Sequence, residues 1–471
     1  MAAITSSPAP LAAPAPPAGG YHSGSSGISL LGGWLPLTIE IVTVVVLIAV
    51  LVRSSRRWWM LWVPVTAAFG VAVAAIAHWF VDQQGLASDP APMQLWLWSA
   101  VFVGSLAVAV LGWRGTRWWR RALSIVLVPL TFTCVALTLN QWVGYYPTVQ
   151  VAWAAATAGP VPDQVVASDL PGLRSTTMST GKVVAVDIPD NASGFKHRTE
   201  YVYLPPAWFA GDAPPKLPVL MMVGGEFNTA ADWLRTGNAI QTVDDYAQAH
   251  GGQAPILAFV DAGGSFNNDT ECVDGPRGNS ASHLVDDVRP YVISTFGASA
   301  DPTNWGVVGW SMGGTCAADL AVMHPDLFTT FEDIAGDIGP TAGTDEQTLD
   351  RLYGGDAALR DRFDPTKVMI GHGPYQGVTG WFQDSDVPPR PGPSPSAPPP
   401  SSGRDGLGGQ DGTHDSGETG AAEQLCATAQ SVGITCSVHT SNGRHTWQFA
   451  AQGFADALPW LATQIHTPGA P

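Results

Sequence analysis

The stretch VVGWSMGGTCAADLA, residues 307–321, decides the fold of this 471-residue chain. Its first residues are apolar and typical of a buried strand, and AADLAVMH behind them is typical of a helix closing at Pro325. Between the two lies the G-x-S-x-G pattern Gly309-Trp310-Ser311-Met312-Gly313. Alone, that pattern occurs by chance, but strand, sharp turn and helix in this order are what an exposed nucleophilic serine requires. We therefore predict Ser311 as a nucleophile, against the alternative of a helix cap in an inactive domain.

Strands and helices alternate around this stretch, over residues 181–466. The predicted strands are 181–189, 200–206, 216–225, 255–262, 304–310, 331–337, 377–384 and 434–440. The predicted helices are 230–250, 280–296, the segment after Ser311, 421–433 and 448–464. Such alternation predicts an α/β domain with a mostly parallel sheet and helices on both faces. Residues 144–180 read as a connector to it.

The first 150 residues have a different character. Residues 34–143 contain four apolar stretches, each long enough to cross a bilayer as a helix. They are placed at 34–52, 60–81, 95–113 and 122–143. Tryptophans cluster near their ends, as in membrane-interface belts. The sequence therefore predicts an all-α bundle of four transmembrane helices ahead of the α/β domain.

Arginines indicate how this bundle is oriented. Arg53, Arg56 and Arg57 follow the first stretch, and four more arginines lie between residues 114 and 121, whereas 1–33 and 82–94 contain no Lys or Arg. By the positive-inside rule, the arginine-bearing loops are cytoplasmic. We expect a multi-pass plasma-membrane protein with both termini and the α/β domain outside the cytoplasm. The leader, residues 1–33, is rich in Ala, Pro, Gly and Ser, which predicts disorder.

Cysteine usage fits this topology. Cys134 lies in the fourth apolar stretch, leaving four cysteines in the outer domain, an even number in an oxidising compartment. The preferred pairs are Cys272–Cys316 and Cys426–Cys436. Free buried thiols are the alternative.

Composition excludes several function classes. The chain holds 22 Lys+Arg against 39 Asp+Glu, a net charge of −17 that speaks against nucleic-acid binding. Histidines are scattered without metal-ligand spacing, and the acids of residues 267–271 lack the pattern of a calcium loop. No phosphate-binding or dinucleotide motif occurs. We expect neither a metal nor a cofactor.

A serine hydroxyl needs a positioned base, which in this kind of fold follows an acid in chain order. His445, in SNGRHTW, lies between the last predicted strand and the last helix, where the base is expected. His439 falls inside the strand and His414 in a low-complexity run, so both are weaker candidates. His445 is the predicted base.

Three residues are candidates for the acid. Asp384 and Asp386, in GWFQDSDVP, follow the preceding strand, and alternation along a strand lets both side chains point the same way. We prefer Asp386, which lies further past the strand end. Asp384 is second, and Glu423, at the start of the next helix, is third.

The oxyanion hole should use two backbone N–H groups. One belongs to Met312, the residue after the serine. The other should come from VGGEFN, residues 223–228, as the N–H of Glu226 or Gly225. For the Glu226 side chain, a solvated loop carboxylate is the favoured interpretation.

These motifs together resemble the putative-esterase branch of the α/β-hydrolases, the group of esterase D and the antigen 85 mycolyltransferases. The resemblance covers about residues 180–465, through PVLMMVGGEFN, DTECVDGPRGN, GWSMGG and GRHTW. It implies Ser311 as nucleophile, His445 as base, and Met312 and Glu226 as oxyanion donors.

Two features depart from the family. The mycolyltransferase acid is a glutamate on the helix before the last strand; here the matching position is Cys426, with Glu423 one turn earlier. Residues 387–420 form a Pro/Gly/Ser-rich insert between acid and base, which we expect to be a disordered surface excursion.

The sequence thus predicts a membrane-anchored, extracytoplasmic serine esterase or acyltransferase that uses a Ser-His-Asp triad. Tethering at the bilayer favours lipid or cell-envelope esters, with a glycolipid or sugar hydroxyl as acceptor if the acyl group is transferred. One alternative is an inactive hydrolase-fold scaffold on a membrane anchor. Another is a transporter using Glu40 and His78, since ionisable groups within spans are often functional.

Overall fold

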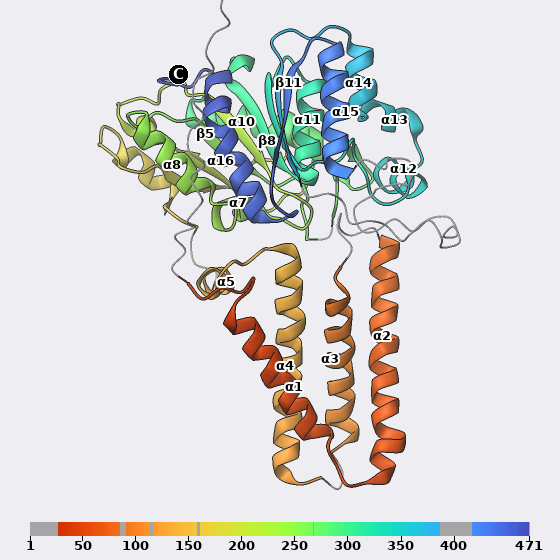
Figure 1. Cartoon of the computed structure of the whole chain (residues 1–471). Helices are drawn as coiled ribbons and strands as arrows, with labels where there is room; N and C mark the ends of the chain where they lie inside the picture. The colour runs from red at the N-terminus through yellow and green to blue at the C-terminus, as the bar shows by residue number, and fades with distance from the viewer. Residues whose placement is uncertain are drawn as a thin grey trace, which may run out of the picture.

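The computed structural model describes residues 27–84, 91–113, 116–157, 161–266, 268–386 and 417–470. Four long helices form one part of the molecule, and an α/β domain sits at one end of them (Figure 1). Most of the predicted leader and of the 387–420 insert lies outside the described residues.

The N-terminal helices are α1 (Trp34–Leu51), a π-helical segment (Trp58–Trp62) continuing into α2 (Val63–Gln84), α3 (Met93–Leu111) and α4 (Trp118–Val143). All four are long and apolar enough to cross a membrane. The structure therefore confirms four long apolar helices at the predicted places, each within a few residues of the predicted bounds.

Small and hydroxylated residues hold these helices together. A Cβ on Gly70 of α2 would lie 2.2 Å from the Ala100 carbonyl oxygen, so glycine allows α2 and α3 to approach closely. The Ser105 and Thr131 hydroxyls join α3 to α4 at 3.1 Å. Glu40, a candidate transport residue, accepts a hydrogen bond from the Gln94 amide at 2.9 Å, near the start of α1 and α3.

A nine-stranded sheet forms the centre of the α/β domain, in the order β1-β2-β3-β5-β4-β8-β9-β10-β11. Its strands are β1 (Gln164–Val165), β2 (Lys182–Val186), β3 (Glu200–Leu204), β4 (Val219–Val223), β5 (Ile256–Val260), β8 (Trp305–Trp310), β9 (Thr330–Ile334), β10 (Thr379–Ser385) and β11 (Thr435–Ser441). Only β3 runs antiparallel to its neighbours. All eight predicted strands are present, and the mostly parallel sheet is confirmed. The short strand β1 and the hairpin β6 (Asp274–Gly275)–β7 (Gly278–Asn279) were not predicted.

Helices cover both faces of the sheet (Figure 1). One face carries α7 (Ala230–Arg235), α8 (Ala239–Ala249) and α16 (Trp447–Gln464), and the other α10 (Arg289–Phe296), α11 (Met312–Met323) and α15 (Gly417–Ser431). The predicted helix 230–250 is two helices, since Asn238 takes a left-handed conformation (φ 54°) between them. Sequence periodicity missed α12 (Asp345–Tyr353), α13 (Ala357–Arg362) and α14 (Pro365–His372). The remaining short helices are α5 (Val149–Ala156), α6 (Pro206–Phe209) and α9 (Ser280–Ser282).

Two disulfides brace the domain. Cys272–Cys316 and Cys426–Cys436 are both formed, which confirms the predicted pairing, and Cys134 is free and buried. The first ties the loop after β5 to α11, directly behind Ser311. The second joins α15 to β11, the strand that leads to His445.

Candidate active site

Ser311 sits on a strained turn between β8 and α11. Its φ of 59° and ψ of −126° are rare for a residue with a side chain. A Cβ on Gly309 would lie 1.6 Å from the Gly313 carbonyl oxygen, and one on Gly313 would lie 2.5 Å from that of Val223. The two glycines therefore let the chain turn sharply enough to place the serine at the carboxyl edge of the sheet.

His445 reaches this serine from 134 residues further along the chain. Its Nε2 lies 2.9 Å from the Ser311 hydroxyl oxygen. The imidazole packs beside the indole of Trp310, with ring centroids 5.1 Å apart, and Trp310 in turn contacts Trp447 at the start of α16. The structure thus brings the predicted nucleophile and base into hydrogen-bond contact, and two tryptophan rings pack on one side of the base.

The candidate acids differ in burial. Asp384 is 2% exposed at the end of β10, whereas Asp386 and Glu423 are exposed. The segment carrying both aspartates is tied to the turn before His445: the Ser385 hydroxyl donates to the Gly443 carbonyl at 2.6 Å, and the Asp386 N–H donates to that of Ser441 at 3.0 Å. Burial therefore distinguishes Asp384, the second choice from the sequence, from the other two candidates.

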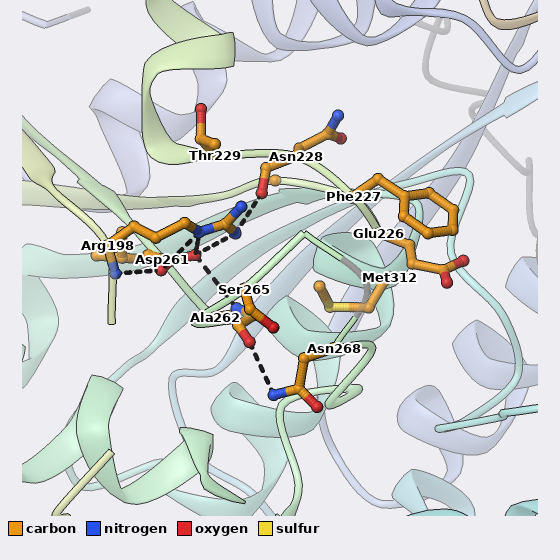
Figure 2. Close-up of a pocket in the computed structure, with 14 residues that line it drawn as sticks. Arg198, Glu226, Phe227, Asn228, Thr229, Asp261, Ala262, Ser265, Asn268 and Met312 are labelled. Carbon is orange, nitrogen blue, oxygen red and sulfur yellow. Dashed lines mark hydrogen bonds and ion pairs between the residues drawn. The ribbon is translucent and has the colours of Figure 1, made fainter. Parts of the chain in front are cut away.

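The oxyanion candidates lie against the serine. Met312 begins α11, so its N–H is among the groups that a helix N-terminus leaves without an intrahelical acceptor. A Cβ on Gly225 would lie 3.1 Å from the Ser311 Cβ, which shows how closely the loop after β4 passes the nucleophile. Gly225, Glu226 and Met312 line one pocket (Figure 2).

An ion pair that the sequence analysis missed holds this loop. The Arg198 guanidinium contacts the buried carboxylate of Asp261 at 2.6 Å and donates to the Asn228 carbonyl, also at 2.6 Å (Figure 2). Asp261 directly follows β5, and Arg198 precedes β3. The pair connects two strand ends to the loop, and its partners are too far apart in sequence to suggest the contact.

Acidic side chains gather beside the loop after β4, residues 224–229, which holds the candidate oxyanion donors and is called the oxyanion loop below. Burial raises the pKa of Glu226 to about 8, and Asp269 acts in the same direction while Arg277 opposes it. Burial also raises the pKa of Asp269, and it raises that of Glu271 well above its usual range. The Glu226 side chain, expected to be solvated, is instead half-buried and carries a proton at neutral pH.

This pKa predicts a fall in activity at alkaline pH. Below pH 8 the Glu226 side chain is neutral; as pH rises through about 8 it becomes negative, close to where the reaction develops an oxyanion. We expect kcat/KM to fall by about tenfold between pH 7 and pH 9.5, the effect of roughly 1.4 kcal/mol of repulsion. The measurement is the ratio of kcat/KM at these two pH values, taken within each variant.

The matched variant is Glu226→Gln, which keeps the shape and cannot ionise. In this variant, kcat/KM at pH 7 and at pH 9.5 should agree within about twofold. An alkaline fall of the same size in this variant would assign the ionisation to another group.

One buried cluster has the spacing of metal ligands. His197, Glu200 and His283 present ligand atoms within 4.8 Å of one another. Both ring nitrogens of His197 also lie within hydrogen-bond distance of backbone carbonyls, Nδ1 at 2.8 Å from Arg198 and Nε2 at 2.6 Å from Ile188. Carbonyl oxygens only accept, so both nitrogens must donate, which leaves neither lone pair for a metal.

The charges in this cluster also favour a protonated His197 over a metal ligand. Burial alone lowers the pKa of His197, but Glu200 and the two carbonyls outweigh it, and the net shift is upward. His283 also lies between carboxylates, 3.2 Å from Glu200 and 3.4 Å from Asp287. The cluster is best described as a buried ion-pair network. Because His283 lies 83 residues after Glu200 in the sequence, spacing did not reveal the cluster.

The α/β domain matches a known protein family. Residues 195–460 match the model of the family described as putative esterase. An uncharacterised protein of Corynebacterium glutamicum is 27% identical over 444 residues, 90% of this chain and 94% of the relative, so the likeness reaches into the N-terminal helices.

Two solved structures are also similar. An S-formylglutathione hydrolase from Agrobacterium tumefaciens has 16% identity and a TM-score of 0.47, covering 62% of this chain and 98% of its own. The MPT51 protein of Mycobacterium tuberculosis has 16% identity and a TM-score of 0.35, covering 60% and 100%. Because the family model matches more than half of the chain, the protein belongs to the putative esterase family of α/β-hydrolases.

Proposed function

We propose that this protein is a membrane-anchored serine esterase or acyltransferase whose catalytic domain lies outside the cytoplasm. The observation that carries the proposal is the 2.9 Å contact between His445 Nε2 and Ser311 Oγ, on a turn strained in the way a nucleophile requires. Family membership supports carboxylic-ester chemistry.

In the first half-reaction, Ser311 Oγ bonds to the ester carbonyl carbon as His445 Nε2 takes the hydroxyl proton. The oxyanion that forms is held by the N–H of Met312 and by that of Glu226 or Gly225. Collapse breaks the bond to the alcohol oxygen, which leaves with the proton from His445. An aspartate orients and stabilises the imidazolium, and the buried Asp384 is preferred to the exposed Asp386 for this role.

In the second half-reaction, water or a sugar or lipid hydroxyl attacks the acyl-enzyme and gives its proton to His445. The tetrahedral intermediate then collapses: the bond between the acyl carbon and Ser311 Oγ breaks, and His445 returns the proton to Oγ, which regenerates the free serine. With water the product is an acid, and with another alcohol it is a new ester. The membrane anchor supports lipid or cell-envelope esters as substrates, because tethering concentrates the domain where such molecules reside. The six described arginines of the helical part lie between α1 and α2 and at the start of α4, at the ends of the helices away from the α/β domain (Figure 1). By the positive-inside rule, they support a cytoplasmic location for those ends and an outside location for the α/β domain.

A fluorophosphonate probe tests the proposal directly, since it bonds only to an activated serine. In detergent-solubilised protein we expect labelling at the Ser311 peptide, located by mass spectrometry, and at least about a 100-fold slower labelling rate in His445→Ala. His372→Ala, which changes an exposed histidine on α14, is the matched control and should label at the wild-type rate. Labelling of His445→Ala at the wild-type rate would rule out His445 as the base.

A further inference from the structure

The active site is joined rigidly to the end of the last apolar helix. α4 ends at Val143, and the next residue, Gly144, accepts a hydrogen bond from the Gln448 amide at 2.8 Å. A Cβ on Gly144 would lie 2.7 Å from the Thr446 Cβ, so the backbone here presses against the residue that follows His445. The exit of the helix thus contacts the segment that positions the base.

Tyr145, the residue after Gly144, is linked to the oxyanion side of the site. The Tyr145 hydroxyl donates to the Asp232 carboxylate, which itself accepts from the Thr229 N–H at 2.6 Å and so closes the first turn of α7. Thr229 ends the oxyanion loop and lines the pocket beside Met312. Two consecutive residues therefore hold both the base side and the oxyanion side of the site.

The joint has little freedom to move. Asn140, in the last turn of α4, makes two hydrogen bonds to the backbone of Tyr146, at 2.7 and 2.9 Å. The segment before α1 pairs with the segment after α4, through hydrogen bonds Leu30–Pro147 at 3.0 Å and Val149–Ile28 at 2.9 Å. The chain therefore enters and leaves the helix bundle at the same end, and these hydrogen bonds hold the two segments together.

These contacts set the distance of the site from the bilayer. Counted from Arg121, the part of α4 that can lie in hydrocarbon ends at Val143, and its 22 residues at 1.5 Å each span about 33 Å, close to the ~30 Å core. Gln448 lies three residues after His445, and three steps of ~3.5 Å place His445 within about 10 Å of the contact with Gly144. The headgroup layer is ~5–8 Å thick on each side. The carboxyl edge of the sheet, where α16 begins, faces the end of the helix bundle (Figure 1). With the bundle inserted in a bilayer, this edge would face the membrane surface.

Two phenylalanines lie at this edge. Phe227, in the oxyanion loop, contacts Phe266, in the loop after β5, with ring centroids 5.4 Å apart. Phe266 is 70% exposed, the one aromatic side chain so exposed among the described residues after residue 160. Trp153, on α5 beside the bundle, is 70% exposed too, as expected for a residue anchored at the interface.

We propose that the catalytic centre takes its substrate directly from the adjacent leaflet: an amphipathic ester whose acyl chain leaves the bilayer along Phe227 and Phe266. This inference rests on the proposed function. A soluble ester would gain nothing from an exposed Phe266 beside Phe227 at the bilayer surface, whereas an acyl chain leaving the leaflet would keep apolar contact with both rings.

The position of the edge is tested without catalysis. The full-length protein, with Cys134→Ala and either Phe266→Cys or Ile370→Cys labelled with bimane, is reconstituted in phosphatidylcholine vesicles containing doxyl-labelled lipid. Ile370 is the matched control, because it is 64% exposed on α14, on the side away from the helices in Figure 1. We expect strong quenching at 266 and none at 370. Equal quenching at the two positions would overturn the proposal.

Substrate choice is tested in the same vesicles. We compare kcat/KM for a bilayer-dissolved palmitoyl ester with that for a water-soluble butyryl ester. Phe266→Gln should lower the palmitoyl-to-butyryl ratio about tenfold, as for the loss of one apolar contact along the chain, and Ile370→Gln should leave it unchanged. An unchanged ratio in Phe266→Gln would overturn the proposed chain path. Failure of both esters in wild-type protein would overturn the proposed esterase function instead, while the quenching result would still decide which edge faces the bilayer.

Discussion

Replacing Ser311 by alanine should lower kcat for any ester by about 10⁵–10⁶-fold, to the level left by the oxyanion hole and binding alone. The reason is chemical: without Oγ no acyl-enzyme forms, and His445 has no hydroxyl at 2.9 Å to activate. Alanine accepts the same φ of 59° at about the same cost, so the turn should persist. The measurement is release of p-nitrophenol from a short-chain ester in detergent.

Ser294→Ala is the matched control, because Ser294 is an exposed serine on α10 whose hydroxyl, within the described part of the chain, bonds to the Tyr291 carbonyl of its own helix. It should retain full activity. If Ser311→Ala kept more than about 1% of the wild-type turnover, the chemistry would not pass through this serine, and the scaffold alternative would gain support.

The second large effect is expected at Asp384. Asparagine there keeps the shape but removes the charge that stabilises the imidazolium, and it favours the wrong tautomer of His445, so kcat should fall by about 10⁴-fold. The burial of Asp384 is the reason to expect this, because a carboxylate shielded from water interacts more strongly with a nearby cation. The same assay, run at pH 7, measures it.

The exposed candidates provide the comparison. Asp386→Asn and Glu423→Gln should each change kcat by less than about tenfold, since water screens a carboxylate on the surface. A 10⁴-fold loss confined to Asp386→Asn would restore the order preferred from the sequence. A loss confined to Glu423→Gln would instead place the acid on the helix, as in the mycolyltransferases.

Much of the fold was predictable because its patterns are local. Apolar runs of bilayer length predicted the four helices, and the alternation of strands and helices predicted every strand of the nine-stranded sheet except the two-residue β1. The helices α12 to α14 were missed because they are only nine, six and eight residues long, so tertiary contacts rather than periodicity define them. The break at Asn238 was missed for a similar reason: one residue in a left-handed conformation leaves the helical pattern on each side intact.

The sequence by itself determined the elements whose requirements are met within a few residues: the apolar helices, the strained turn at Ser311, and the place of His445 after the last strand. Only the tertiary structure decided what depends on segments far apart in the chain. It buried Asp384 and left Asp386 exposed, gathered carboxyl groups around Glu226, and built the network of His197, Glu200 and His283. It also fastened Gly144 and Tyr145 to the two sides of the site. Burial and charge proximity are properties of the packed molecule, so no local pattern encodes them.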